Sequence, residues 1–142
     1  MKPRITIITL GVNDLNKSRS FYKEALGWEP AKGSDDNIVF YNQGGIAFSL
    51  YPLNKLAEDA MIPAVKSGFS GVTLAINLDS KEAVDQLYQQ VIANGGKSLV
   101  EPRDTFWGGY DCYFADPDGQ AWEIAWAPFW QYDEKGSLLL DG

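Results

Sequence analysis

The sequence predicts an α+β protein made of two βαβββ modules, whose curled mixed sheets together form a cup. The first observation is the order of the periodic segments, which runs strand, helix and two or three strands, and then repeats. The second is the alignment of the halves: Phe21-Tyr22 falls on Leu87-Tyr88, and the turn at 42–45 falls on the turn at 116–119. A helix behind each curled sheet leaves a concave face open, where we expect a ligand.

The first module begins with a strand and a helix. Residues 5–12 are largely β-branched and apolar, which is typical of a strand. Asn13-Asp14 offers an N-cap, and apolar side chains then recur at helical spacing as far as Gly27, a residue that suits a helix C-terminus. Two further strands are expected at 36–41 and 45–51.

The second module repeats this order after a segment of weak periodicity. Residues 53–69 predict a linker with at most one helical turn. A strand is expected at 72–78, and Asp79 and Glu82 fit a capping box for a helix that ends at Gly95. Three strands follow near 97–103, 110–115 and 121–127. The chain thus divides into module one at 5–52, a linker at 53–70, module two at 71–127 and a C-terminal tail at 128–142.

The composition limits the classes of partner. A chain of 142 residues, 45% of them hydrophobic, suits one compact domain. Its net charge of −7 disfavours nucleic acids and anionic membranes, which select basic surfaces. Cys112 is the single cysteine, so no internal disulfide is possible. No apolar run approaches the ~20 residues that span a bilayer, and the N-terminus lacks the pattern of a signal peptide. We therefore expect a cytoplasmic protein.

The most informative local feature is a carboxylate in an apolar strand. The Asp-Pro-Asp-Gly turn at 116–119 leads into a strand in which Glu123 lies between Trp122 and Ile124. Such a carboxylate is unfavourable unless a partner compensates it. The whole chain contains no histidine, so Glu123 has no imidazole beside which to ligate a metal. Tyr110, Asp111 and Tyr113 are neighbours along the chain that could act with it.

Aromatic residues make up 13% of the chain, and they fit either core packing or an aromatic-lined pocket. Two glycines between Trp107 and Tyr110 predict a bend that would present both rings at the mouth of the cup. Phe48 would line the cup or pack in the core.

Three segments carry a resemblance to a known family. They are Leu10-Gly11-Val12-Asn13-Asp14-Leu15 running into Ser18-Arg19-Ser20-Phe21-Tyr22, then Thr105-Phe106-Trp107-Gly108-Gly109-Tyr110, and then Tyr113-Phe114-Ala115-Asp116-Pro117-Asp118-Gly119 with Trp122-Glu123. Over residues 5–127 the chain resembles the vicinal oxygen chelate superfamily, which includes glyoxalase I, extradiol dioxygenases and bleomycin-resistance proteins. The resemblance implies a paired βαβββ fold, usually a homodimer, with the site in the sheet cup.

The resemblance also implies four positions for metal ligands. The first-strand positions, usually His, are Ile7 and Thr73, and the last-strand positions, usually Glu, are Ser49 and Glu123. Only Glu123 keeps a ligand side chain. Zinc, nickel, manganese or iron would be the family's metals, but transition metals in such sites prefer imidazole and carboxylate ligands. We therefore expect no metal and no other cofactor.

The sequence favours a metal-independent, homodimeric protein that binds a small organic molecule in an aromatic-lined cup. The candidate ligand-binding residues are Phe48, Ser49, Thr73, Trp107, Tyr110 and Glu123. One alternative is a glyoxalase-like lyase or isomerase, or a dioxygenase-related enzyme, with Glu123 as catalytic base or metal ligand. Another is a protein–protein module whose cup is filled by its own side chains. A site within one chain and a site completed by a second chain are both compatible with the sequence.

Overall fold

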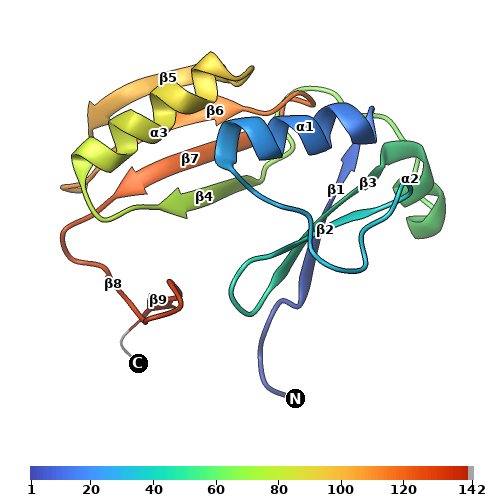
Figure 1. Ribbon diagram of the computed structural model, residues 1–142, viewed down its shortest axis with the longest axis horizontal. Helices are drawn as coiled ribbons and strands as arrows, with labels where there is room; N and C mark the ends of the chain where they lie inside the picture. Colours follow the sequence, from blue (N-terminus) through green and yellow to red (C-terminus); the bar gives the residue numbers. More distant parts are fainter. Residues whose placement is uncertain (141–142) are drawn as a thin grey trace.

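The computed structural model describes residues 1–140 and shows an α+β fold (Figure 1). Its elements in chain order are β1 (Ile7–Val12), α1 (Leu15–Leu26), β2 (Val39–Asn42), β3 (Ala47–Pro52), α2 (Leu53–Ala60), β4 (Thr73–Asn77), α3 (Lys81–Ala93), β5 (Lys97–Asp104), β6 (Tyr110–Ala115), β7 (Ala121–Trp126), β8 (Gln131–Tyr132) and β9 (Leu138–Leu139). No helix within residues 1–140 is both long and apolar enough to cross a membrane.

Two mixed sheets carry the repeat that the sequence predicts. One has the strand order β1-β3-β2 and the other β4-β7-β6-β5. In each sheet the first strand pairs in parallel with the last, while the other pairs are antiparallel. The predicted α+β class and its glyoxalase-like arrangement are confirmed. The first module has two strands after its helix and the second has three.

The late start of strand β2 has a local cause. The segment before β2 forms a turn in which the Asp35 carboxylate accepts hydrogen bonds from the backbone amides of Asn37 and Ile38, at 2.7 and 3.1 Å. These amides are therefore satisfied by a side chain rather than by a neighbouring strand. The strand expected from residue 36 begins at Val39 for this reason.

The helices begin and end at residues suited to those places. The Asp14 carboxylate caps α1 by accepting a hydrogen bond from the Lys17 amide, and Gly27 ends the helix in the left-handed conformation with φ 72°. For α3 the cap is Ser80 rather than Asp79, because the Ser80 hydroxyl accepts from the Ala83 amide.

The linker contains a two-turn helix, α2, where the sequence suggested at most one turn. Its side chains pack against Gly11 of β1, where a Cβ would lie 2.7 Å from Leu53 Cδ1. Short helices gain most of their stability from such tertiary packing. The periodicity of residues 53–60 alone is too short to predict it.

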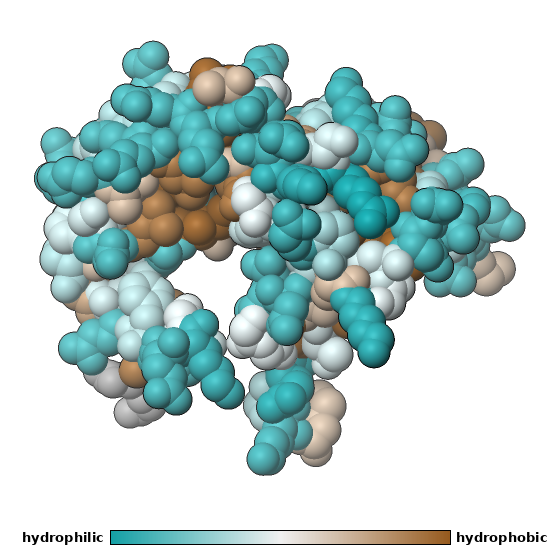
Figure 2. Space-filling model, viewed as in Figure 1, coloured by the Kyte–Doolittle hydropathy of each residue, from teal (hydrophilic) through white to brown (hydrophobic). Residues whose placement is uncertain are grey.

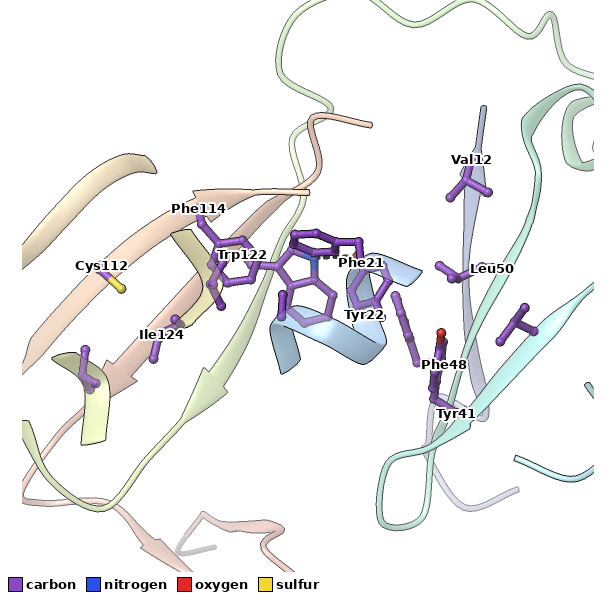
Figure 3. Close-up of a cluster of buried hydrophobic side chains, with 14 residues drawn as sticks. Val12, Phe21, Tyr22, Tyr41, Phe48, Leu50, Cys112, Phe114, Trp122 and Ile124 are labelled. Carbon is purple, nitrogen blue, oxygen red and sulfur yellow. Dashed lines mark hydrogen bonds between the residues drawn. The ribbon is translucent and has the colours of Figure 1, made fainter. Parts of the chain in front are cut away.

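The core is shared by both modules (Figure 3). The two long helices pack side by side across the junction. Near the middle of the core, Trp122 Nε1 donates a hydrogen bond to the Tyr22 hydroxyl at 3.0 Å, and that hydroxyl donates to the Asp116 carboxylate at 2.7 Å. This chain of hydrogen bonds satisfies three polar groups in an apolar surrounding, and it ties α1 to the β6–β7 turn.

The Asp-Pro-Asp-Gly turn connects the two modules as well as two strands. The Asp118 carboxylate accepts hydrogen bonds from the Asn13 amide at 2.8 Å and from the Ser18 hydroxyl at 3.2 Å. Asp116 accepts from the amides of Asp118 and Gln120 inside the turn, both at 2.9 Å. The turn of module two thus holds the first turn of α1.

Candidate functional site

Each sheet has a face covered by its long helix and a face without it. In β7 the side chains of Trp122 and Ile124 belong to the core on the helix side. Because side chains alternate along a strand, Glu123 lies on the helix-free face. Its neighbours across the sheet are Ala75 on β4 and Tyr113 on β6.

Four polar side chains gather there: Arg103, Asp111, Tyr113 and Glu123, which we call the Glu123 cluster. Asp111 shares the helix-free face with Tyr113, two residues further along β6, and is only 2% exposed. The Arg103 guanidinium donates to an Asp111 carboxylate oxygen at 3.2 Å, so the buried charge of Asp111 is paired. Glu123 is half-buried.

The cluster raises the pKa of Glu123 from 4.5 to about 7. Burial is the main cause, and the hydrogen bond with Asp111 and the negative charge of that group add to it. The Tyr113 hydroxyl and the Arg103 charge act in the opposite direction. Glu123 therefore changes its protonation state near neutral pH, and in its protonated form it can both donate and accept a hydrogen bond.

The environment of Tyr113 follows from the same neighbours. Burial, then the negative charges of Glu123 and Asp111, raise the pKa of the phenol. Tyr113 thus stays protonated as a hydrogen-bond donor beside Glu123.

The first sheet carries a different set of groups on the face away from α1, where helix α2 packs at Gly11. The Ser49 hydroxyl lies 2.6 Å from the Thr9 hydroxyl, directly across the β1–β3 pair. Ile7 is on the same face, opposite Ala47. Ser49 is buried, and its hydroxyl is already hydrogen-bonded within the sheet.

One chain does not bring the two sets together. Ile7 and Ser49 belong to the first sheet, whereas Thr73 and Glu123 belong to the second, and no strand pairing joins the two sheets within residues 1–140. Phe48 and Trp122 both point into the shared core in Figure 3. The residues that follow them, Ser49 and Glu123, therefore point away from that core on separate sheets.

The aromatic candidates are also separated from Glu123. The Tyr110 hydroxyl donates to Asp85 of α3 at 2.7 Å, which places Tyr110 on the helix face. Trp107 packs against the rings of Phe129 and Trp130, with centroids 6.3 Å away in each case.

The bend expected between Trp107 and Tyr110 is present. Gly108 has φ 93°, and a Cβ on Gly109 would overlap the Trp107 ring. Phe48 is buried in the core, with its ring 5.5 Å from those of Tyr22 and Trp122.

Sequence reasoning missed Arg103. It lies on β5, where it pairs with Asp111 across the β5–β6 hairpin. The register is regular next to the loop at 105–109, where Asp104 pairs with Tyr110 and Arg103 with Asp111, and it shifts only further along the hairpin. The pair can therefore be counted from the loop only when the ends of both strands, Asp104 and Tyr110, are known. Asp111 and Tyr113 were recognisable as neighbours of Glu123 through the β6–β7 turn.

The family's metal does not fit the residues present. The four positions that resemble its ligands offer a hydrocarbon side chain, two neutral hydroxyls and one carboxylate. Asp111 could supply a second carboxylate, but it is paired with Arg103. Within residues 1–140 no group of three or more His, Cys, Asp or Glu side chains is placed to hold a metal ion. Transition metals prefer imidazole, thiolate and carboxylate ligands, so this donor set is too poor for such an ion.

Comparisons with known proteins agree with the fold and identify the family. Residues 4–124 match the model of the Glyoxalase/Bleomycin resistance protein/Dioxygenase superfamily. A glyoxalase-related enzyme from Fulvimarina pelagi is 34% identical, with a TM-score of 0.90 over 98% of this chain and 99% of that one. No curated protein sequence matches the chain.

Two further solved structures are similar. A glyoxalase/bleomycin resistance protein/dioxygenase from Nocardioides is 27% identical, with a TM-score of 0.74 over 89% of this chain and 85% of that one. A lactoylglutathione lyase from Agrobacterium tumefaciens is 21% identical, with a TM-score of 0.69 over 92% and 98%, and this likeness concerns the fold alone. The two-module fold and the family match over most of the chain agree. The chain belongs to the glyoxalase/bleomycin resistance protein/dioxygenase superfamily.

Proposed function

We propose that this protein binds a small organic molecule on the helix-free face of its second sheet, with Glu123 as the anchoring group. The observation that carries the proposal is the Glu123 cluster, in which a half-buried carboxyl group lies beside the Tyr113 phenol and the buried Asp111–Arg103 pair. Polar groups converging on an open sheet face fix the orientation of a ligand. The ligand we expect carries a hydroxyl or cationic group that pairs with Glu123.

The aromatic contact in this proposal comes from Tyr113. Its ring belongs to the same sheet face as Glu123, whereas Tyr110 is engaged with Asp85 on the other face. Thr73 lies on the Glu123 face at the exposed start of β4. In this proposal Thr73 contacts the rest of the ligand.

Metal independence belongs to this proposal and rests on the donor chemistry. Its test is the metal content of the untagged protein after exposure to zinc, nickel, manganese and iron(II), measured by elemental mass spectrometry. We expect metal far below one ion per chain. One ion per chain or per dimer would contradict the proposal.

A homodimer would complete the site. The strands β1 and β4 are free edges of their sheets, and beside them Ile7 and Val72 are 50% and 52% exposed. Free edges with apolar side chains favour pairing with another chain. Pairing with a second copy would place the Ser49 face of one chain opposite the Glu123 face of the other. Sedimentation equilibrium tests this assembly, and a monomer at micromolar concentration would contradict it.

The cytoplasmic location expected from the sequence stays a prediction.

The binding test uses a charge-neutral variant. In Glu123→Gln the affinity for a hydroxyl-bearing or cationic ligand found by thermal-shift screening should fall by about 1–3 kcal/mol, the range for a lost charged hydrogen bond. Glu82→Gln, at an exposed position in the first turn of α3, is the matched control and should bind normally. Unchanged affinity in Glu123→Gln would contradict the assignment.

A lyase or isomerase is the second candidate, favoured by the pKa of about 7 for Glu123. A carboxylate titrating near neutral pH can remove a proton from a carbon next to a carbonyl group. The hemithioacetal of methylglyoxal and glutathione tests this chemistry without added metal. Turnover that Glu123→Gln abolishes would support the enzyme, and no turnover above the uncatalysed rate would exclude it for that substrate.

A further inference from the structure

A second concavity lies between the two sheets, apart from the Glu123 cluster. It is a cleft of about 420 Å³, which is within the range of small-molecule sites. Its walls include Trp28, Phe48 and Trp122 from the core side of both modules. Figure 2 shows an opening between the C-terminal segment and the rest of the molecule, with hydrophobic residues along its upper wall.

The aromatic wall is firmly placed. The Trp28 ring lies 5.9 Å from that of Phe48 and 5.7 Å from that of Trp122, and both pairs meet edge to face. Phe48 and Trp122 lie 5.5 Å apart in the same manner. Phe48 and Trp122 are each 4% exposed and belong to the core. Trp28 is only partly buried, so it is the ring of this wall that a flat ligand can reach, and the two buried rings hold it in place.

The lining also determines the charge of an occupant. None of the side chains lining the cleft is ionisable, although the chain as a whole carries a net charge of −7. A charged group moved from water to such a surrounding would lose hydration without a compensating partner. Polar contacts come from the side-chain amides of Gln43 and Asn77, one at each sheet. An uncharged molecule with a hydrogen-bonding group suits this lining.

The C-terminal hairpin β8–β9 borders the same cleft. Gly136, in its turn, is one of the lining residues. Asn77 Nδ2 donates to the Tyr132 hydroxyl at 3.0 Å, which ties the hairpin to β4. On the other side, the Lys135 carbonyl oxygen lies 3.4 Å from where a Cβ on Gly44 would be. The hairpin therefore reaches from one sheet to the other at the cleft.

From these observations we propose that the cleft between the modules is a binding site for an uncharged, planar aromatic compound. The compound contacts the Trp28 ring, and it hydrogen-bonds the amides of Gln43 and Asn77. The aromatic wall of the cleft lies on the opposite side of the second sheet from Glu123, whereas Ala75 and Asn77 of the edge strand β4, which also line the cleft, lie on the Glu123 side. The cleft lies between β1 and β4, the strand edges proposed above for pairing with a second copy, so a dimer that covers it would overturn this proposal.

The test uses prodan, an uncharged naphthalene ketone whose emission shifts to the blue when water is excluded. We expect saturable binding with one site per chain. In Trp28→Ala the dissociation constant should rise about tenfold or more, and in Gln43→Ala it should rise about threefold. Trp130→Ala, which alters an aromatic residue outside the cleft, should bind prodan like the unaltered chain, and so should Glu123→Gln.

Circular dichroism establishes that each variant is folded. Should Trp28→Ala fail to fold, Gln43→Ala and Asn77→Ala remain as tests, since both residues lie at the margin of the cleft rather than in the core. Absence of prodan binding would overturn the proposal, because it would mean that the cleft is closed by the hairpin or by a second chain. Equal binding by all cleft variants would also overturn it, by locating the probe elsewhere, such as the apolar groove beside α2.

Discussion

At the scale of single residues, Glu123 has the most unusual environment in the second sheet. Its pKa near 7 combines burial with the proximity of Asp111, whose own charge is held by Arg103. The sequence shows Glu123 among apolar residues of a predicted strand, and this pattern predicted that its carboxylate would need a partner. Its neighbours Asp111 and Tyr113 could be recognised through the β6–β7 turn. Arg103 could not, because it lies on β5 beyond the loop at 105–109 and pairs with Asp111 rather than with Glu123.

The stability of the protein should depend on pH through Glu123. Its pKa is higher in the folded state, so between about pH 4.5 and about pH 7 the folded chain binds a proton that the unfolded chain has released. The free energy of unfolding should therefore fall as pH rises through this window. In Glu123→Gln this decline should be smaller, so the variant gains relative stability between about pH 5 and about pH 8. Urea denaturation at both pH values measures the free energy of unfolding of each protein. The same pH dependence in the unaltered chain and in Glu123→Gln would contradict the prediction.

Tyr22 should be a sensitive position for stability. Tyr22→Phe removes the hydroxyl that donates to Asp116 and accepts from Trp122. Leaving buried partners unsatisfied costs about 1–3 kcal/mol, and we expect a loss of that size in urea denaturation. Tyr88→Phe is the control, because its hydroxyl bonds Ser98 at the exposed surface and should contribute far less. Equal losses in both variants would argue against the buried network.

At the scale of elements, the sequence predicted the long helices and the strands of the second module closely. Their periodicity and end residues were strong, as in α1 between Asp14 and Gly27. Elements whose stability comes from tertiary contact were harder. Helix α2 depends on Gly11 of β1, and the start of β2 depends on the turn at Asp35.

The packing of α2 on β1 can be tested at Gly11. This glycine has no positive φ, so Gly11→Ala tests space rather than backbone strain. The added Cβ would press on Leu53, and overpacking of this kind typically costs about 1–3 kcal/mol in unfolding free energy. Adding Leu53→Ala should recover part of the loss by removing the contacting side chain. A double mutant less stable than the sum of its singles would contradict this explanation.

The C-terminal hairpin should loosen when its tie to β4 is removed. Tyr132→Phe deletes only the hydroxyl that accepts from Asn77. Amide hydrogen exchange at residues 131–139 should quicken several-fold while exchange in β6 and β7 stays unchanged. Tyr51→Phe serves as a control with a hydroxyl outside this contact. Unchanged exchange at the hairpin would show that other contacts hold it in place.

At the scale of the whole molecule, the two modules share one core but keep two separate sheets. The Tyr22–Trp122 pair and the turn at 116–119 hold them together. The internal repeat predicted two modules, yet it could not predict how they are placed. That placement puts Ser49 and Glu123 on separate faces, so the cup expected from the sequence requires a second chain in our proposal.

The central claim is that Glu123 acts as a proton-holding group beside Asp111 rather than as a metal ligand. Carboxyl carbon NMR of the untagged, metal-free protein, with the Glu123 signal assigned by its loss in Glu123→Gln, tests it most directly. We predict a titration midpoint near pH 7 that added zinc leaves unchanged. A midpoint near 4.5, the ordinary value, or a large downward shift on adding zinc would contradict the account.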